Sequence, residues 1–268
     1  MDWLHVFVLA SIQGLTEFLP VSSSAHLILP SQILGWPDQG LGFDVGVHVG
    51  TLAAVLIYFR KDVIAMWLAF FKTLKGEQSI DGRIAWFIIA ASVPAVIAGL
   101  LLNDVVDLYG RSMLVIAGTT LVFGALLWFA DRRENVQKTL ADLTLRDSIY
   151  IGLAQAVALI PGTSRSGITM TAALMLGFSR AAAARFSFFL SIPIILAAGS
   201  YKTLELASLD VQVPWDRVIG GVFISAIVAI TCIHYFLILL EKVGMLPFVI
   251  YRMLLGVFLI ALYFYTGG

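Results

Sequence analysis

Long apolar stretches alternate with short polar segments along most of the chain. A helix of about 20 apolar residues crosses the roughly 30 Å hydrocarbon core of a bilayer. Six stretches approach this length, and they cover residues 43–59, 84–102, 112–130, 186–201, 217–240 and 248–266. The pattern predicts six transmembrane helices, of which the first and fourth are short. A further apolar run over residues 63–71 is expected at the membrane interface.

Two other apolar regions are interrupted by polar residues and do not fit a simple span. Region 3–35 is broken by LPVSSSAH, and region 149–177 is broken by IPGTSRSG. At about 1.5 Å per residue, neither half of either region crosses a bilayer alone. A break exposed to lipid would leave backbone N–H and C=O groups without partners, at several kcal/mol each. Each region is therefore expected to form a re-entrant helical hairpin whose break lies inside protein.

The two interrupted regions resemble each other when Pro20 is set against Pro161. Three predicted spans separate them, and an odd number of crossings inverts the second region relative to the first. Inverted repeats with paired broken helices place the functional site where the breaks meet. We therefore expect an all-α polytopic membrane protein with two inverted-topology repeats, six transmembrane helices and two re-entrant helical hairpins. Residues 1–268 would form a single membrane domain, with repeat 1 near residues 1–130 and repeat 2 near residues 148–268.

The overall composition supports a membrane location. Of the 268 residues, 60% are apolar and 13% are charged, whereas soluble domains have about 45–50% apolar and about 25% charged residues. This excess is too large for a soluble core of such a length. The formal net charge is zero, so no overall field attracts nucleic acid. A polar connection at residues 131–147 separates the two halves.

Basic residues are distributed unevenly between the two sides of the predicted topology. Most Lys and Arg residues, including Arg60, Lys61 and Arg252, fall on or near one side. Few, such as Lys202 and Arg217, fall on the other side. The positive-inside rule makes the basic side cytoplasmic. Both termini and the opening of the first hairpin are then expected on the outer side.

The first break combines an acid, several hydroxyls and an imidazole. Glu17 lies at the end of an apolar helix, with Gln13 one turn earlier on the same face. The next helix begins with three serines, Ser22, Ser23 and Ser24. His26 follows Ser23 closely enough to meet it in the first helical turn. A helix N-terminus offers free N–H groups and a positive dipole, which suit an anion such as phosphate.

The second break repeats this theme with a fixed positive charge. Thr163, Ser164 and Ser166 are hydroxyl donors around Arg165, and Thr169 can share a helical face with that arginine. Arginine forms bidentate hydrogen bonds with phosphate oxygens. If the two breaks touch, these groups converge at membrane depth, where ionisable residues are typically functional.

This constellation is suited to phosphoryl transfer on a lipid phosphate. A carboxylate beside a phosphate calls for a bridging divalent cation, with Glu17 and Gln13 as oxygen ligands. Ser23 is the candidate nucleophile, and His26 is the candidate base or leaving-group acid. The expected phosphate-binding residues are Ser22, Ser24, Ser164, Arg165, Ser166 and Thr169. Attack by Ser23, by a histidine or by metal-bound water is compatible with these residues.

Other interpretations of these residues stay open at this level. Serines after a helix-ending proline often act as caps, and Glu17 and Arg165 could form a structural ion pair. A lone histidine in a membrane helix is more often a hydrogen-bonded packing residue. We apply this packing interpretation to the remaining histidines, His5, His48 and His234.

The two signature segments resemble those of a known family. QGLTEFLPVSSSAH and PGTSRSGITM are similar to the two motifs of the undecaprenyl-diphosphate phosphatase family, also called bacitracin-resistance proteins. The resemblance extends over the whole chain. It implies a multi-pass enzyme of the bacterial inner (plasma) membrane that hydrolyses undecaprenyl diphosphate to undecaprenyl phosphate and inorganic phosphate. This reaction recycles the lipid carrier for cell-wall synthesis and requires a divalent cation, Mg²⁺ or Ca²⁺.

The resemblance also implies catalytic roles for Glu17, Ser23, His26 and Arg165, and an active site that opens on the periplasmic side. Many family members have Glu where this chain has Gln13, so Glu17 would carry more of the metal binding. The expected partners are the lipid substrate and bilayer lipids, with no nucleic acid, and a homodimer is compatible with the sequence. The alternative from another class is a transporter or flippase of polyprenyl phosphate lipids, because paired broken helices also suit a carrier.

Overall fold

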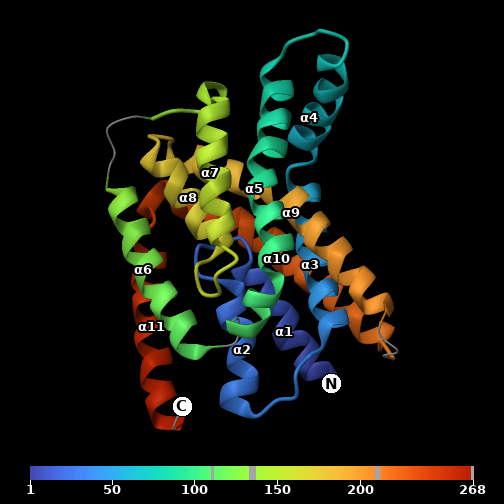
Figure 1. Cartoon of the computed structure of the whole chain (residues 1–268), viewed down its shortest axis with the longest axis vertical. Coiled ribbons are helices and arrows are strands. Elements are labelled where there is room, and N and C mark those ends of the chain that lie inside the picture. The colour runs from blue at the N-terminus through green and yellow to red at the C-terminus, as the bar shows by residue number, and fades with distance from the viewer. Residues whose placement is uncertain (110–111, 133–136, 209–211, 267–268) are drawn as a thin grey trace.

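The computed structural model describes residues 1–109, 112–132, 137–208 and 212–266, and its regular elements in these ranges are helical (Figure 1). Six described helices are long and apolar enough to cross a membrane. They are α3 (Leu41–Tyr58), α5 (Ile80–Tyr109), α6 (Met113–Asp131), α9 (Arg180–Ser208), α10 (Trp215–Val243) and α11 (Leu246–Thr266). The predicted all-α, six-span membrane fold is confirmed. The chain is therefore a multi-pass membrane protein.

The fourth span is longer than its hydropathy predicted. The expected range was 186–201, whereas α9 contains 29 residues. Charged residues at both ends of this helix limited the apolar stretch, but they have partners in the fold. Within the helix Arg185 pairs with Asp62 at 2.7 Å and Lys202 pairs with Glu205 at 2.9 Å, so neither charge ends the helix.

The apolar run over residues 63–71 belongs to α4 (Arg60–Thr73). This helix packs along the first part of α5, and the two form the end of the molecule opposite both chain termini (Figure 1). Its outer face exposes Trp67 and Phe71. A position at the membrane interface stays a prediction for this helix. The polar connection at 131–147 lies partly outside the described residues, and its described part contains the short 3-10 helix η1 (Leu140–Asp142).

Both interrupted regions form pairs of short helices joined by a non-helical turn. The pairs are α1 (Trp3–Thr16) with α2 (Ser23–Leu34), and α7 (Leu145–Val157) with α8 (Arg165–Met175). In each pair the first helix ends four residues before a proline, Pro20 or Pro161. Proline has no N–H to donate to the carbonyl four residues earlier, and its ring clashes with that carbonyl. The course of the two pairs through the bilayer stays a prediction.

Each turn, taken with the first residues of the helix that follows it, is called a tip here: the first tip covers residues 17–23 and the second tip covers residues 158–166. They match in detail, although one residue out of step with the proline alignment. The N-cap residues Ser22 and Ser164 have φ of 73° and 70°, values that L-residues rarely adopt. Setting Pro20 against Pro161 would instead pair Ser22 with Thr163. The proline alignment holds for the ends of α1 and α7, but the cap serines are offset because the second tip has one residue more between its proline and its cap serine.

A buried phenylalanine cluster anchors the first tip. Phe18 is fully buried, and its ring meets that of Phe188 edge-on, with centroids 5.3 Å apart. Phe186 and Phe189 are also buried in the same core. The FSFF stretch of α9 therefore packs inside the protein and fixes the tip beside the middle of that helix.

Close packing of α7 against α5 yields a stability prediction. A Cβ added at Gly152 would lie 2.4 Å from the carbonyl oxygen and 2.7 Å from the Cα of Ala91. We expect Gly152→Ala to push the helices apart and to reduce stability by about 1–3 kcal/mol, seen as a lower Tm in detergent. Gly118→Ala is the matched control, since nothing lies within 4 Å of its added Cβ. Equal Tm values for the two variants would contradict this packing.

Candidate active site

The two tips meet through an ion pair between Glu17 and Arg165. Arg165 Nη2 lies 2.9 Å from Glu17 Oε1, and the two side chains are only 14% and 9% exposed. A second link joins the tips, because the Ser166 hydroxyl donates to the Leu19 carbonyl at 2.8 Å. The structure therefore confirms that the two breaks converge, as their sequence similarity predicted.

Both oxygens of the Glu17 carboxylate are engaged. While Oε1 accepts from Arg165, Oε2 accepts from the Ser23 hydroxyl and from Gln13 Nε2, each at 3.0 Å. Gln13 is fully buried, and its Oε1 atom has no hydrogen-bond partner within the described part of the chain. The Glu17 carboxylate therefore binds the candidate nucleophile Ser23, the Arg165 guanidinium and the Gln13 amide, whose oxygen has no partner among the described residues.

Arg165 is oriented from α9 by a residue that the sequence analysis missed. Its Nη1 donates to the Ser187 carbonyl at 2.9 Å, and the Thr169 hydroxyl donates to Ser187 Oγ at 2.8 Å. Ser187 is the single polar residue of the FSFF stretch, and this isolated polar position could have indicated that it contacts the site. The hydroxyls of Thr169 and Ser166 donate to Ser187 Oγ and to the Leu19 carbonyl, and a phosphate-binding role for these two residues stays a prediction.

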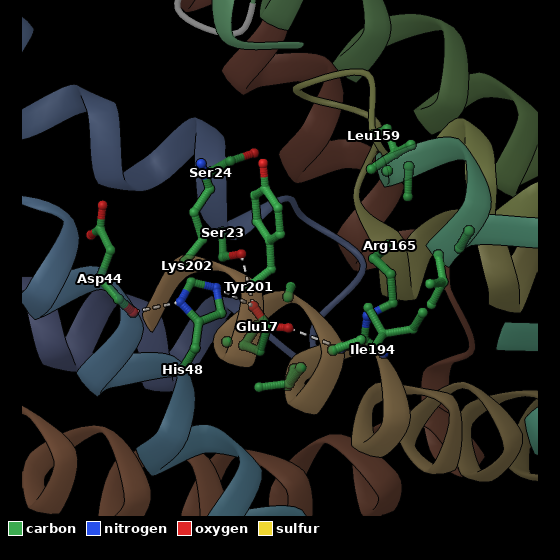
Figure 2. Close-up of a pocket in the computed structure, with 18 of the residues that line it drawn as sticks. Glu17, Ser23, Ser24, Asp44, His48, Leu159, Arg165, Ile194, Tyr201 and Lys202 are labelled. Carbon is green, nitrogen blue, oxygen red and sulfur yellow. Dashed lines mark hydrogen bonds and ion pairs between the residues drawn. The ribbon is translucent and has the colours of Figure 1, made fainter. Parts of the chain in front are cut away.

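A pocket of about 550 Å³ opens in front of this cluster (Figure 2). Of the predicted site residues, those that line it are Glu17, Ser22, Ser23, Ser24, Ser164 and Arg165. Gln13, His26, Ser166 and Thr169 are not among its lining residues. An apolar wall comes from α5 and α9, including Gly99 and Ala198, while Tyr201 and Lys202 of α9 add polar groups to the lining (Figure 2). The site thus combines a polar end with an apolar flank.

His48 of α3 also lines the pocket, so the packing interpretation is wrong for this histidine. Its Nε2 lies 3.8 Å from Glu17 Oε2, and its Nδ1 bonds the Asp44 carbonyl at 2.7 Å (Figure 2). Asp44 lines the pocket as well. These two residues lie one helical turn apart on one face of a predicted span, a polar pairing that could have indicated the site. His5 and His234 instead contact the rings of Trp36 and Tyr58.

His26 does not have the partner that the sequence suggested. Its Nδ1 donates to the Ser22 carbonyl at 2.7 Å, and its Nε2 lies 2.5 Å from the Tyr251 hydroxyl. The Ser23 hydroxyl is bonded to Glu17 instead. His26 reaches the carbonyl four residues earlier in its own helix and turns toward α11. A role for His26 as base or leaving-group acid stays a prediction.

Arg252 has a role that the charge count did not predict, since that count only placed it on or near the basic side. The structure buries it completely in α11. Its guanidinium donates to carbonyl oxygens of both tips, those of Pro20, Gly162 and Thr163, at 3.0–3.2 Å. A single basic residue inside an otherwise apolar span was the signal for this role.

A family model described as bacitracin resistance protein BacA matches residues 6–258. The chain belongs to the BacA family. A relative from Saccharophagus degradans, named undecaprenyl-diphosphatase, is 58% identical over 266 residues, which cover 99% of this chain and 100% of the relative. One from Teredinibacter turnerae with the same name is 57% identical over 260 residues, covering 97% of this chain and 98% of the relative.

A third relative, from Pseudoalteromonas translucida, is named undecaprenyl-diphosphatase 1 and is 58% identical over 261 residues. It matches 97% of the chain and 98% of its own length. Membership of the BacA family confirms the resemblance seen in the two signature segments. In this BacA-family chain those segments form the two tips, which explains why they carry the residues of the pocket.

Proposed function

We propose that this chain is a membrane phosphatase that hydrolyses undecaprenyl diphosphate to undecaprenyl phosphate and inorganic phosphate. The observation that carries the proposal is the Glu17–Arg165 pair, which joins the two tips at the polar end of a pocket with an apolar flank. The names of the relatives support the same substrate and do not favour the transporter or flippase alternative. The reaction would return the lipid carrier to cell-wall synthesis.

In this proposal Ser23 attacks the terminal phosphorus of the diphosphate. Glu17 Oε2, which accepts the Ser23 hydroxyl in the structure, takes the proton as the Oγ–P bond forms. The bond from that phosphorus to the bridging oxygen breaks, and undecaprenyl phosphate leaves with the electron pair. Water then cleaves the phosphoserine to release inorganic phosphate. The planar guanidinium of Arg165 stabilises the equatorial phosphoryl oxygens during both displacements.

The residues present fit a divalent cation, Mg²⁺ or Ca²⁺. Glu17 supplies a carboxylate, and the unpartnered Gln13 Oε1 supplies a second oxygen beside it. The described residues contain no cluster of three or more His, Cys, Asp or Glu side chains, so substrate phosphates and water would complete the ligand set, as is usual for Mg²⁺. When bound, the cation offsets the repulsion between Glu17 and the diphosphate.

The prenyl chain of the substrate would lie along the apolar wall from α5 and α9, in contact with bilayer lipids. Both chain termini lie at the end of the molecule opposite α4, and we propose that this end faces the periplasm (Figure 1). The many basic residues near the opposite end support this orientation through the positive-inside rule. A monomer or a homodimer would serve the same chemistry, because all the proposed groups come from one chain.

The proposed activity is tested by phosphate release from a C55 diphosphate with purified protein in detergent. We expect release with Mg²⁺ or Ca²⁺ and loss of release with a chelator, since a cation held by Glu17 and Gln13 would offset the repulsion between Glu17 and the diphosphate. In detergent no membrane separates two compartments, and a transporter does not cleave the diphosphate. A transporter would therefore release no inorganic phosphate in this assay. Absence of phosphate release by the purified chain at any divalent cation concentration would contradict the proposal.

A further inference from the structure

The backbone carbonyls of the first tip are held by neighbouring helices behind the pocket. Arg252 Nη1 donates to the Pro20 carbonyl at 3.2 Å. The carbonyl of Ser22 accepts from His26 Nδ1, whose other ring nitrogen contacts the Tyr251 hydroxyl. In a neutral ring with Nδ1 protonated, Nε2 is an acceptor, so Tyr251 donates. Two consecutive residues of α11 thus fix the first tip, one directly and one through His26.

The carbonyls of the second tip are held in the same way from α6 and α11. Thr119 and Thr120 donate to the carbonyls of Pro161 and Gly162. Arg252 Nη2 donates to the carbonyls of Gly162 and Thr163 at 3.1 and 3.0 Å. One guanidinium therefore bridges both tips, and no carboxylate in the described part of the chain forms an ion pair with it.

These contacts matter because phosphate repels carbonyl oxygens. Tip residues that line the pocket, such as Ser22 and Ser164, have strained left-handed backbones. The carbonyl oxygen of Ser22 is held by His26, which contacts Tyr251 of α11, and Arg252 of the same helix holds the second-tip carbonyls. Such strain persists only where surrounding contacts hold it. Loss of the bridge would free the tips to shift and to turn oxygens toward the bound anion.

We propose that Arg252 and Tyr251 are positioning residues that lock the two tips together for the reaction, an inference that rests on the proposed phosphatase function. Neither residue lines the pocket in which the substrate would bind. Arg252 acts through the tip carbonyls and Tyr251 acts through His26. They set the relative position of Glu17 and Ser23 on one tip and Arg165 on the other.

The test uses Arg252→Lys and Tyr251→Phe in the full-length chain, with phosphate release from a C55 diphosphate as the assay. Lysine keeps the charge, but its single nitrogen cannot replace the two guanidinium nitrogens that reach one tip each, so we expect kcat to fall about 100-fold with KM nearly unchanged. Removing only the Tyr251 hydroxyl should lower kcat about tenfold. The inhibition constant of orthovanadate, which mimics the transition state, should rise in parallel with the loss of kcat, while that of inorganic phosphate stays constant.

Matched controls separate positioning from folding. Tyr265→Phe alters a 90% exposed tyrosine of the same helix, and Arg185→Lys alters an arginine paired with Asp62; both should match the wild type. A normal kcat in Tyr251→Phe, or a lower Tm with normal kcat per folded molecule, would overturn the proposal. If Arg252→Lys does not fold, Tyr251→Phe decides, because its partly exposed ring remains in place. An inactive wild type would refute the proposed function instead.

Discussion

Arg165→Lys should lower kcat/KM for phosphate release by about 100- to 1,000-fold, although the positive charge is kept. In the structure one guanidinium nitrogen binds Glu17 Oε1 and the other binds the Ser187 carbonyl, both at 2.9 Å. This fork holds a planar group in a fixed orientation at the pocket. A lysine ammonium is a point charge that reaches one partner at a time, so it loses the paired contacts to phosphoryl oxygens. Steady-state phosphate release in detergent measures the effect.

The control for this variant is Arg185→Lys, on the same helix as Ser187. Arg185 pairs with Asp62 at 2.7 Å, and both side chains are about two-fifths exposed. We expect its kcat/KM to stay within about twofold of the wild type, because an exposed ion pair contributes at most about 1 kcal/mol. A near-normal rate for Arg165→Lys would show that only the charge is needed, and the proposed planar recognition would be wrong.

Glu17→Gln should reduce kcat about 1,000-fold and remove the response to divalent cation. The substitution preserves shape, but it takes away the charge that pairs with Arg165 and the oxygen that accepts the Ser23 proton. In the glutamine side chain an NH₂ group replaces one carboxylate oxygen. This NH₂ group is itself a donor, so it cannot accept a hydrogen bond from the donors that bind the Glu17 carboxylate, namely Arg165, Ser23 and Gln13. A cation-dependence curve of phosphate release, recorded beside the wild type, measures both effects.

This variant also tests whether the Glu17–Arg165 pair is only structural. If the pair is only structural, the variant should have a lower Tm but a normal kcat per folded molecule. If the carboxylate is catalytic, the folded molecules of the variant should have a much lower kcat. Breaking a buried pair commonly costs about 3–5 kcal/mol, so Tm must be recorded in either case. Glu77→Gln is the control, since Glu77 is an exposed residue in a loose pair with Lys72. A Glu17→Gln rate within a few-fold of the wild type would remove this residue from the mechanism.

The sequence predicted several parts of this protein correctly, because they depend on residues close together in the chain. Six apolar stretches are long enough to span, and the structure has six such helices. The two prolines end α1 and α7 four residues early through local backbone chemistry. One long-range contact was also predicted: paired broken helices of inverted repeats bring their breaks together, and Glu17 of one break does meet Arg165 of the other. Family membership followed from the two signature segments around them.

The partners of individual side chains came only from the tertiary structure. Ser23 bonds Glu17 rather than His26, His48 reaches the pocket from α3, and Arg252 binds carbonyls of both tips. A soluble helix shows its buried face as an apolar stripe, but a membrane helix is apolar all round. Its sequence therefore does not say which face meets protein and which meets lipid. That choice is made by the packing of several helices at once, and it decides which polar residues enter the site.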